Sequence, residues 1–347
     1  MENDSLFSSQ PGSENQEKNA DEQSSSVSFI YPSKPGQENK KGNVWLRSFT
    51  SLALYLLIGY YFFSANWLLL LILTAIVIFH EFGHFLAMKT YHYKDLGIFF
   101  IPLLGAYASG TKREVSQRQS AVILLAGPMP GIIIGIVLFL ITNNRQDEIS
   151  YETFSLLRTT AGLLIFLNVL NLLPIYPLDG GQLLNRLFLD ESKLIGKIFV
   201  IISAGVLTWL ALFGLGRPFY PLLLFPAMML LRLRTDTRFD ELTKKIEEKG
   251  INLEKTYEEL TDEEYWTIRN ILIESNYPTL RNINPAPPYE YSASEDKVVT
   301  AIENILQRTI IQDLSWPGKL LIILIWAGSF AAPFLLHLDL PFSHYHS

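Results

Sequence analysis

Residues 67–88 read WLLLLILTAIVIFHEFGHFLAM, an apolar stretch long enough to cross a lipid bilayer as one helix. His80 and His84 lie four positions apart near its end, so in a helix both imidazoles project from one face and can reach one metal ion. Glu81 follows His80, where a carboxylate can take a proton from a water that the metal activates. Ionisable side chains at membrane depth are costly and usually mark a functional site. The stretch therefore predicts a metal site built into a membrane-spanning helix.

The composition places much of the chain in lipid. Hydrophobic residues make up 49% of the 347 residues, charged residues only 18%, and the mean hydropathy is +0.20. Soluble proteins carry about 25% charged residues. Because the sequence has no cysteine, disulfides and thiolate ligands are excluded, and a metal must be held by His, Asp or Glu. No basic surface indicates a nucleic-acid partner.

Apolar segments predict an α-helical polytopic membrane protein with about seven transmembrane helices. The expected spans are 47–63, 67–88, 119–141, 155–173, 194–213, 217–232 and 318–336. With the N-terminus in the cytosol, 14 Lys and Arg residues lie at the inner flanks and three at the outer flanks, a positive-inside bias that favours this orientation in a cell membrane. Residues 96–110 are apolar but broken by Gly and Pro, which predicts a short re-entrant or β segment shielded by protein.

These patterns divide the chain into four expected regions. They are a disordered polar tail (1–43), a membrane-embedded core (44–233), a cytosolic helical module (234–317) and a last transmembrane helix with a short tail (318–347). The module holds 17 acidic and 10 basic residues, a net charge of −7. In it, Thr261 and Glu264 form a capping box before a helix at 265–274, and Ser294 precedes a helical pattern at 295–312. Either this module binds a protein partner or it is a packed appendage.

The HEFGH motif leaves one metal ligand to be found, because a catalytic zinc has three protein ligands and a water. The best candidate is Asp179, in the stretch NLLPIYPLDGG at 171–181. Its two prolines end the preceding span, and its two glycines let the backbone bend sharply, so Asp179 can face the helix bundle. The expected topology places both motifs at the cytosolic ends of their spans. The active site is therefore expected on the cytosolic side.

Together, HEFGH and NLLPIYPLDGG resemble the motifs of the site-2 protease family of intramembrane zinc metalloproteases, over roughly residues 67–190. The resemblance implies that Zn²⁺ is bound by His80, His84 and Asp179. It also implies that Glu81 is the catalytic base and that Asn171 helps to hold the substrate or the developing oxyanion.

A further part of the resemblance departs from the family pattern. The Gly127-Pro128 pair resembles the Gly-Pro motif of the family, in which an Asn often follows three residues after the Pro. Here Gly131 occupies that place, so a contact assigned to that Asn does not carry over.

The function implied by the resemblance is a zinc metalloendopeptidase that cleaves membrane-protein substrates in or near a transmembrane helix, as in regulated intramembrane proteolysis. Residues 105–109 either offer a strand edge to an unwound substrate or simply fill the bundle. Two other functions compete: a non-proteolytic membrane adaptor that retains the fold, and a metal transporter. Glu81 argues against the adaptor, which needs no base, and the confinement of polar ligands to one end argues against the transporter.

Overall fold

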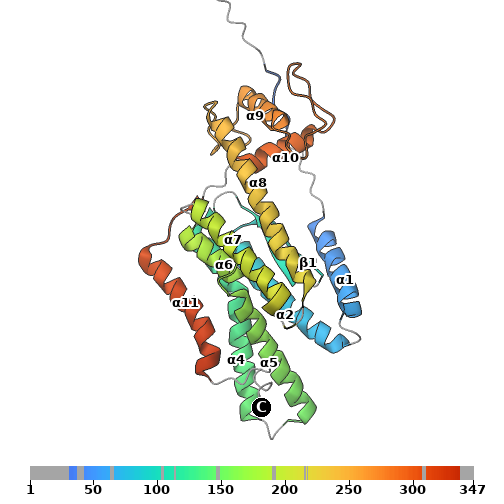
Figure 1. The fold of residues 1–347 in the computed structure, drawn as a ribbon, viewed down its shortest axis with the longest axis vertical. Coiled ribbons are helices and arrows are strands. Elements are labelled where there is room, and N and C mark those ends of the chain that lie inside the picture. The colour runs from blue at the N-terminus through green and yellow to red at the C-terminus, as the bar shows by residue number, and fades with distance from the viewer. Residues whose placement is uncertain are drawn as a thin grey trace, which may run out of the picture.

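Along the long axis of the molecule, a bundle of apolar helices is followed by a small helical module at one end. The computed structural model describes residues 31–36, 43–62, 66–102, 105–112, 115–145, 149–189, 193–214, 216, 218–306 and 310–336. Helices α9 (Asp262–Glu274) and α10 (Glu295–Ile305) stand at one end, beyond the bundle (Figure 1). Helix α8 (Leu224–Glu247) runs from the bundle to that end and joins the two parts.

Five helical stretches among the described residues are long and apolar enough to cross a membrane, which supports a polytopic helical membrane protein. They comprise α2 (Trp67–Thr90), α3 with α4 (Gln117–Ala126 and Pro128–Asn144), α5 (Tyr151–Asn171), α7 with the π-helical turn η2 (Lys193–Trp209 and Leu210–Gly214), and most of α11 (Trp316–Leu335).

The expected count of about seven spans is not confirmed. The first expected span forms α1 (Val44–Phe62), whose Ser, Thr and Arg residues dilute its hydropathy. The expected span 217–232 is broken by the 3-10 turn η3 (Tyr220–Leu223), and α8 becomes charged from Arg232 onward. Neither segment is among the five apolar stretches.

The segment expected to be re-entrant or extended forms an antiparallel hairpin. Strand β1 (Lys94–Ile101) pairs with β2 (Gly105–Thr111), with Ile98 opposite Ala108. Helix α1 packs on β1, where Ser51 Oγ accepts a hydrogen bond from the Phe100 N–H at 3.1 Å. Gly97 permits this approach, because a Cβ there would lie 2.5 Å from Val44 Cγ1. The hairpin therefore lies between α1 and the helix that carries HEFGH.

A second, parallel pair joins β3 (Val115–Ser116) to β4 (Ile310–Ile311). Asp313, just beyond β4, accepts hydrogen bonds from Ser116 Oγ at 2.5 Å and from the Arg118 N–H at 3.1 Å. These bonds fix the start of α3 against the segment that leads into α11.

The module has its own hydrophobic core, built from the end of α8, α9, α10 and the loops between them. The predicted capping box is present: Thr261 Oγ1 accepts from the Glu264 N–H at 3.2 Å, and the Glu264 carboxylate accepts from the Thr261 N–H at 2.8 Å. The helix predicted at 295–312 is shorter, because α10 ends at Ile305 and the chain becomes extended to form β4.

Residues 31–36, which fall within the expected disordered tail (1–43), lie extended on the module. The Trp266 indole N–H, for example, donates to the Pro32 carbonyl at 2.8 Å. Residues 1–30 and 37–42 lie outside the described part of the chain. The polar composition of this segment did not predict the contact, because backbone carbonyls accept many of its hydrogen bonds. Composition does not show which side chains donate to them.

A buried ion pair lies beneath α9. Arg269 Nε donates to Glu295 Oε1 at 2.7 Å, and the Tyr265 hydroxyl donates to the same oxygen at 2.6 Å. Burial raises the pKa of Glu295, but the hydrogen bonds from Arg269 and Tyr265 lower it by more. The pKa of Glu295 therefore lies below its ordinary value. Because the folded-state pKa is depressed, this stabilisation is complete above about pH 4.3 and is lost as the pH falls through the folded-state pKa.

We expect Glu295→Gln to lower the free energy of unfolding of the module at pH 7 by about 1–3 kcal/mol, because the buried Arg269 loses its charged acceptor. The difference from wild type should stay constant down to about pH 4.3 and shrink as the pH falls below that value. Thermal unfolding of the full chain in detergent at several pH values, with hydrogen exchange in α9 and α10 as the readout, measures both effects. Glu274→Gln, at an exposed site, is the control. Equal stability of Glu295→Gln and wild type at pH 7 would contradict the assignment.

Candidate metal centre

Helix α2 supplies three buried polar side chains near its C-terminal end. The exposed fractions of His80, Glu81 and His84 are 6%, 6% and 7%. The helix begins where Asn66 caps it by accepting a hydrogen bond from the Leu69 N–H. From there it continues without a break through the HEFGH motif, so both histidines lie on one face as the spacing predicts.

Asp179 is brought to this face by a tight turn at the end of α5. It begins the short helix α6 (Asp179–Leu184), which packs directly on the turn. A Cβ on Gly180 would lie 1.9 Å from the Leu172 carbonyl oxygen, and a Cβ on Gly181 would lie 2.3 Å from the Ile175 carbonyl carbon. Glycine is therefore required at both positions for α6 to approach the end of α5.

His80, His84 and Asp179, hereafter the His-His-Asp cluster, point one atom each at a common centre. Asp179 Oδ2 lies 3.0 Å from His80 Nε2 and 3.2 Å from His84 Nε2, and the two Nε2 atoms are 3.1 Å apart. Ligand atoms of a tetrahedral zinc, with bonds of about 2.0–2.1 Å, lie about 3.3 Å apart. The triangle thus has nearly the dimensions of three zinc ligands.

The hydrogen bonds on the outer side of each imidazole decide what these atoms can bind. His80 Nδ1 lies 2.7 Å from Asn168 Oδ1, and His84 Nδ1 lies 2.7 Å from the Ile123 carbonyl oxygen. Both partners are acceptors, so each Nδ1 carries the proton and each neutral ring turns its Nε2 lone pair inward. Two lone pairs and a carboxylate oxygen at about 3 Å repel one another unless a metal ion or a shared proton lies between them. The cluster therefore fits zinc by its atoms as well as by its dimensions.

Asn168 is a positioning residue that the sequence patterns did not single out. It is 1% exposed, and its amide donates to the Leu164 carbonyl oxygen at 2.7 Å, which leaves Oδ1 to accept from His80. Gly131 makes room for it, because a Cβ there would lie 2.2 Å from Asn168 Nδ2. Asn168, which comes from α5, therefore occupies the space that a side chain at position 131 would fill.

Asn171 ends α5 one turn further on and is half-buried. Its expected role at the oxyanion stays a prediction.

The Gly-Pro motif has a steric role. A Cβ on Gly127 would lie 2.3 Å from His84 Nε2, and a Cβ on Gly83 would lie 2.0 Å from the Ala126 carbonyl oxygen. Helix α2 therefore approaches the junction of α3 and α4 at a distance that only glycine allows, and this close contact encloses one side of the His-His-Asp cluster.

Strand β2 borders the cluster on another side. The backbone N–H of Ala108 faces the Glu81 carboxylate as a hydrogen-bond donor. The neighbouring Tyr107 is 48% exposed. Among the described residues β2 pairs only with β1, so its other edge carries no strand. A segment added to that edge would run past Glu81.

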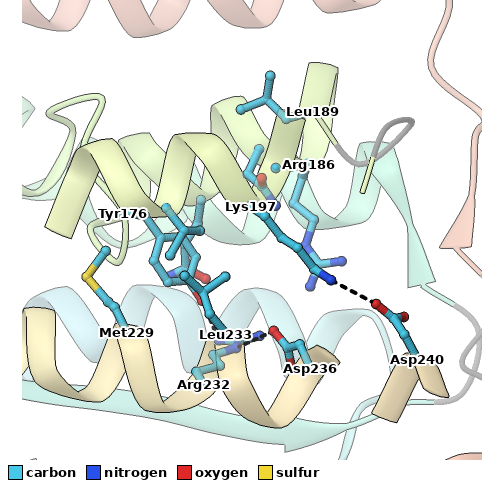
Figure 2. Close-up of a pocket in the computed structure, with 13 residues that line it drawn as sticks. Tyr176, Arg186, Leu189, Lys197, Met229, Arg232, Leu233, Asp236 and Asp240 are labelled. Atoms are coloured by element: carbon cyan, nitrogen blue, oxygen red, sulfur yellow. Dashed lines mark hydrogen bonds and ion pairs between the residues drawn. The ribbon is translucent and has the colours of Figure 1, made fainter. Parts of the chain in front are cut away.

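A separate polar cavity lies between α7, α8 and the loop that precedes Asp179 (Figure 2). Arg232 on α8 pairs with Asp236 and donates to the Tyr176 hydroxyl, and Lys197 on α7 donates to Asp240 at 3.1 Å. No member of the His-His-Asp cluster lines this cavity. Arg232 thus joins α8 to the loop that precedes Asp179, and Lys197 joins α7 to α8.

One family model and two curated proteins are similar to parts of this chain. Residues 68–147 match the model of Peptidase family M50, which confirms the resemblance to the site-2 protease family for this part of the chain. The chain is 31% identical over 149 residues to Zinc metalloprotease MJ0392 of Methanocaldococcus jannaschii. This aligned stretch covers 40% of this chain and 42% of that protein. It is 29% identical over 119 residues to Stage IV sporulation protein FB of Bacillus subtilis, which is 34% of this chain and 40% of that protein. The chain thus spans about two fifths of the length of each relative.

We expect Asn168→Ala to weaken zinc binding about 10–100-fold, the usual cost of losing a residue that orients a metal-binding histidine. Zinc retention against a chelator series measures the affinity. Asn171→Ala is the matched control, because it removes the same amide one turn away and should leave zinc affinity unchanged. Equal effects of the two substitutions would contradict the positioning role of Asn168.

Gly127→Ala should abolish tight zinc binding, because the added methyl would occupy the place of the His84 imidazole. Gly205→Ala on α7 is the control, since a Cβ there meets nothing within 4 Å. Zinc content per chain after gel filtration measures the outcome. A Gly127→Ala protein that keeps one zinc with wild-type affinity would show that α2 and α4 can separate at little cost.

Proposed function

We propose that this chain is a zinc-dependent intramembrane endopeptidase that hydrolyses peptide bonds in or near transmembrane segments of membrane proteins. The observation that carries the proposal is the His-His-Asp triangle of inward acceptor atoms beside Glu81, within apolar helices. The match to Peptidase family M50 and the similarity to a protein named a zinc metalloprotease support the same chemistry. A role in regulated intramembrane proteolysis is the finer form of the proposal.

The chemistry can be divided between the metal and the chain. Zinc held by the His-His-Asp cluster would act as a Lewis acid that makes water acidic and polarises a carbonyl. Glu81 then takes the proton of the attacking water and returns it to the leaving amine. Asn168 and the Ile123 carbonyl keep the imidazoles in one tautomer and orientation throughout. Asn171 is proposed to hold the substrate or its oxyanion at the end of α5.

The substrate must present an accessible carbonyl to this site. A transmembrane helix satisfies its own carbonyls, so it must unwind locally before attack. We propose that the unwound segment adds to the open edge of β2, which runs beside Glu81. Backbone pairing would hold the scissile bond without requiring a particular substrate sequence.

The proposed location is a cell membrane, with the lipid bilayer around the apolar helices and with the N-terminus and the active site on the cytosolic side. The bias of Lys and Arg toward one set of helix flanks supports this orientation. The module at the end of α8 would then lie in the cytosol, where it is proposed to meet a protein partner.

An adaptor that keeps the fold without proteolysis is the alternative. A binding scaffold gains nothing from a buried carboxylate beside a metal site, because burying a charged group costs folding free energy. The burial of Glu81 beside the cluster therefore favours the enzyme.

Glu81→Gln should reduce cleavage by at least about 10²–10⁴-fold, the usual contribution of a general base, while the chain still binds one zinc. Mass spectrometry of new termini in the membrane fraction, compared between wild-type and Glu81→Gln cells, measures cleavage, and metal analysis of the purified chain measures zinc. Glu152→Gln, in the first turn of α5, is the matched control. If the same termini form at the same rate in the Glu81→Gln strain, the adaptor replaces the enzyme.

The β2 edge is tested by crosslinking. Because the chain has no cysteine, Tyr107→Cys in the Glu81→Gln background gives one reactive site beside the proposed substrate path. We expect it to crosslink to accumulated substrate, whereas Tyr61→Cys at the end of α1, 87% exposed in the wild type, should not. If neither Tyr107 nor its neighbours crosslink to substrate, the strand-addition step is contradicted. The catalytic proposal would be unaffected.

A further inference from the structure

The extended segment 31–36 lies on the module as a peptide ligand lies on a receptor. Three backbone carbonyls of the segment face aromatic donors: Pro32 accepts from Trp266 Nε1 at 2.8 Å, and Pro35 accepts from the Tyr257 hydroxyl at 2.8 Å. Between them, the Ser33 carbonyl accepts from the Tyr291 hydroxyl. The module thus binds the backbone of an extended chain. The two prolines of the segment favour this extended conformation.

The ammonium group of Lys34 is the most fully satisfied part of the segment. Its Nζ donates to the carbonyl oxygens of Tyr257 at 2.8 Å, Glu258 at 2.7 Å and Leu260 at 2.5 Å. An ammonium has three N–H donors, and each finds one backbone acceptor. The Lys34 backbone N–H also donates to Asp262 Oδ1 at 2.7 Å, at the start of α9.

Aromatic rings form the wall of this site. Tyr31 packs edge-on against Tyr289, with ring centroids 5.2 Å apart, and Lys34 Nζ lies 5.4 Å from the centre of the Tyr257 ring. Trp266 stacks on Tyr291, with centroids 5.8 Å apart. A set of aromatic rings that carry hydrogen-bond donors is the kind of surface that binds extended proline-containing peptides.

We propose that this face of the module is a peptide-binding site specific for lysine, and that its resident ligand is the Tyr31–Gly36 segment of the same chain. The carbonyl cage selects a compact ammonium over a planar guanidinium, whose five donors have a different geometry. Acetylation of Lys34 would remove the charge and leave three carbonyls with too few donors. The proposal concerns the module alone and does not depend on proteolysis.

The ligand is assigned to the same chain because of the tether. Only residues 37–43 separate Gly36 from the start of α1 at Val44, so the segment stays at a high effective concentration beside the module. Eight residue steps can span at most about 29 Å, so the bound segment also limits how far the module can move from α1. A free peptide of the same chemistry must compete with this tethered one.

Hydrogen exchange of the intact chain in detergent tests the resident ligand. In wild type, the Lys34 backbone amide, which donates to Asp262 Oδ1, should exchange at least about tenfold more slowly than the amide at the same position in Lys34→Met, which keeps the aliphatic stem but has no side-chain donors. Lys297→Met, an exposed site on α10, should exchange as wild type does. Unchanged protection in Lys34→Met would overturn the role of the ammonium. Protection that rises with protein concentration would assign the ligand to a second copy and overturn the same-chain assignment.

Peptide binding tests the specificity of the site. A fluorescent synthetic peptide with the sequence of residues 29–36 should bind the full-length Lys34→Met chain saturably in an anisotropy titration. The same peptide with acetyl-lysine should bind at least about tenfold more weakly, and wild type should bind the unmodified peptide more weakly than Lys34→Met does. Equal affinity for both peptides, or no binding by either, would overturn the proposed lysine specificity.

Discussion

Three acceptor atoms that point at one another are the constraint around which the membrane part of this chain is built. Two imidazole nitrogens and a carboxylate oxygen, about 3 Å apart in a buried site, need a metal ion or a shared proton between them. The surrounding packing serves to hold them there. Asn168 and the Ile123 carbonyl fix the imidazoles from behind, and glycines at the contact points let α2, α4 and α6 come close enough to enclose them.

The geometry of HEFGH could be predicted because helical spacing alone places His80 and His84 on one face. Asp179 could be identified because the cysteine-free sequence leaves few ligand types and because its proline- and glycine-rich surroundings predict a bend. Asn168 was missed, although a signal was present: an amide in the middle of an apolar helix needs a partner. The glycine at position 131 was a second signal, since a missing side chain at a close helix contact leaves space that a neighbour fills.

Two further differences between the sequence patterns and the structure have other physical causes. The polar composition of the N-terminal tail predicts disorder, yet residues 31–36 bind through backbone carbonyls and one ammonium, which hydropathy does not measure. The span count depended on apolar runs, whereas α8 begins as a short apolar helix and continues as a charged one. That continuity matters, because Arg232 on α8 contacts Tyr176 in the loop that precedes Asp179. The module and the candidate metal centre are therefore joined by one helix.

Zinc K-edge X-ray absorption of the purified, full-length chain tests the central claim most directly. The account predicts one zinc per chain, with two imidazole nitrogens at about 2.0–2.1 Å and a carboxylate oxygen at about 2.0–2.2 Å in its first shell. Asp179→Ala should remove that oxygen or the zinc itself. A chain that purifies folded without zinc, or a first shell that is the same in wild type and Asp179→Ala, would contradict it.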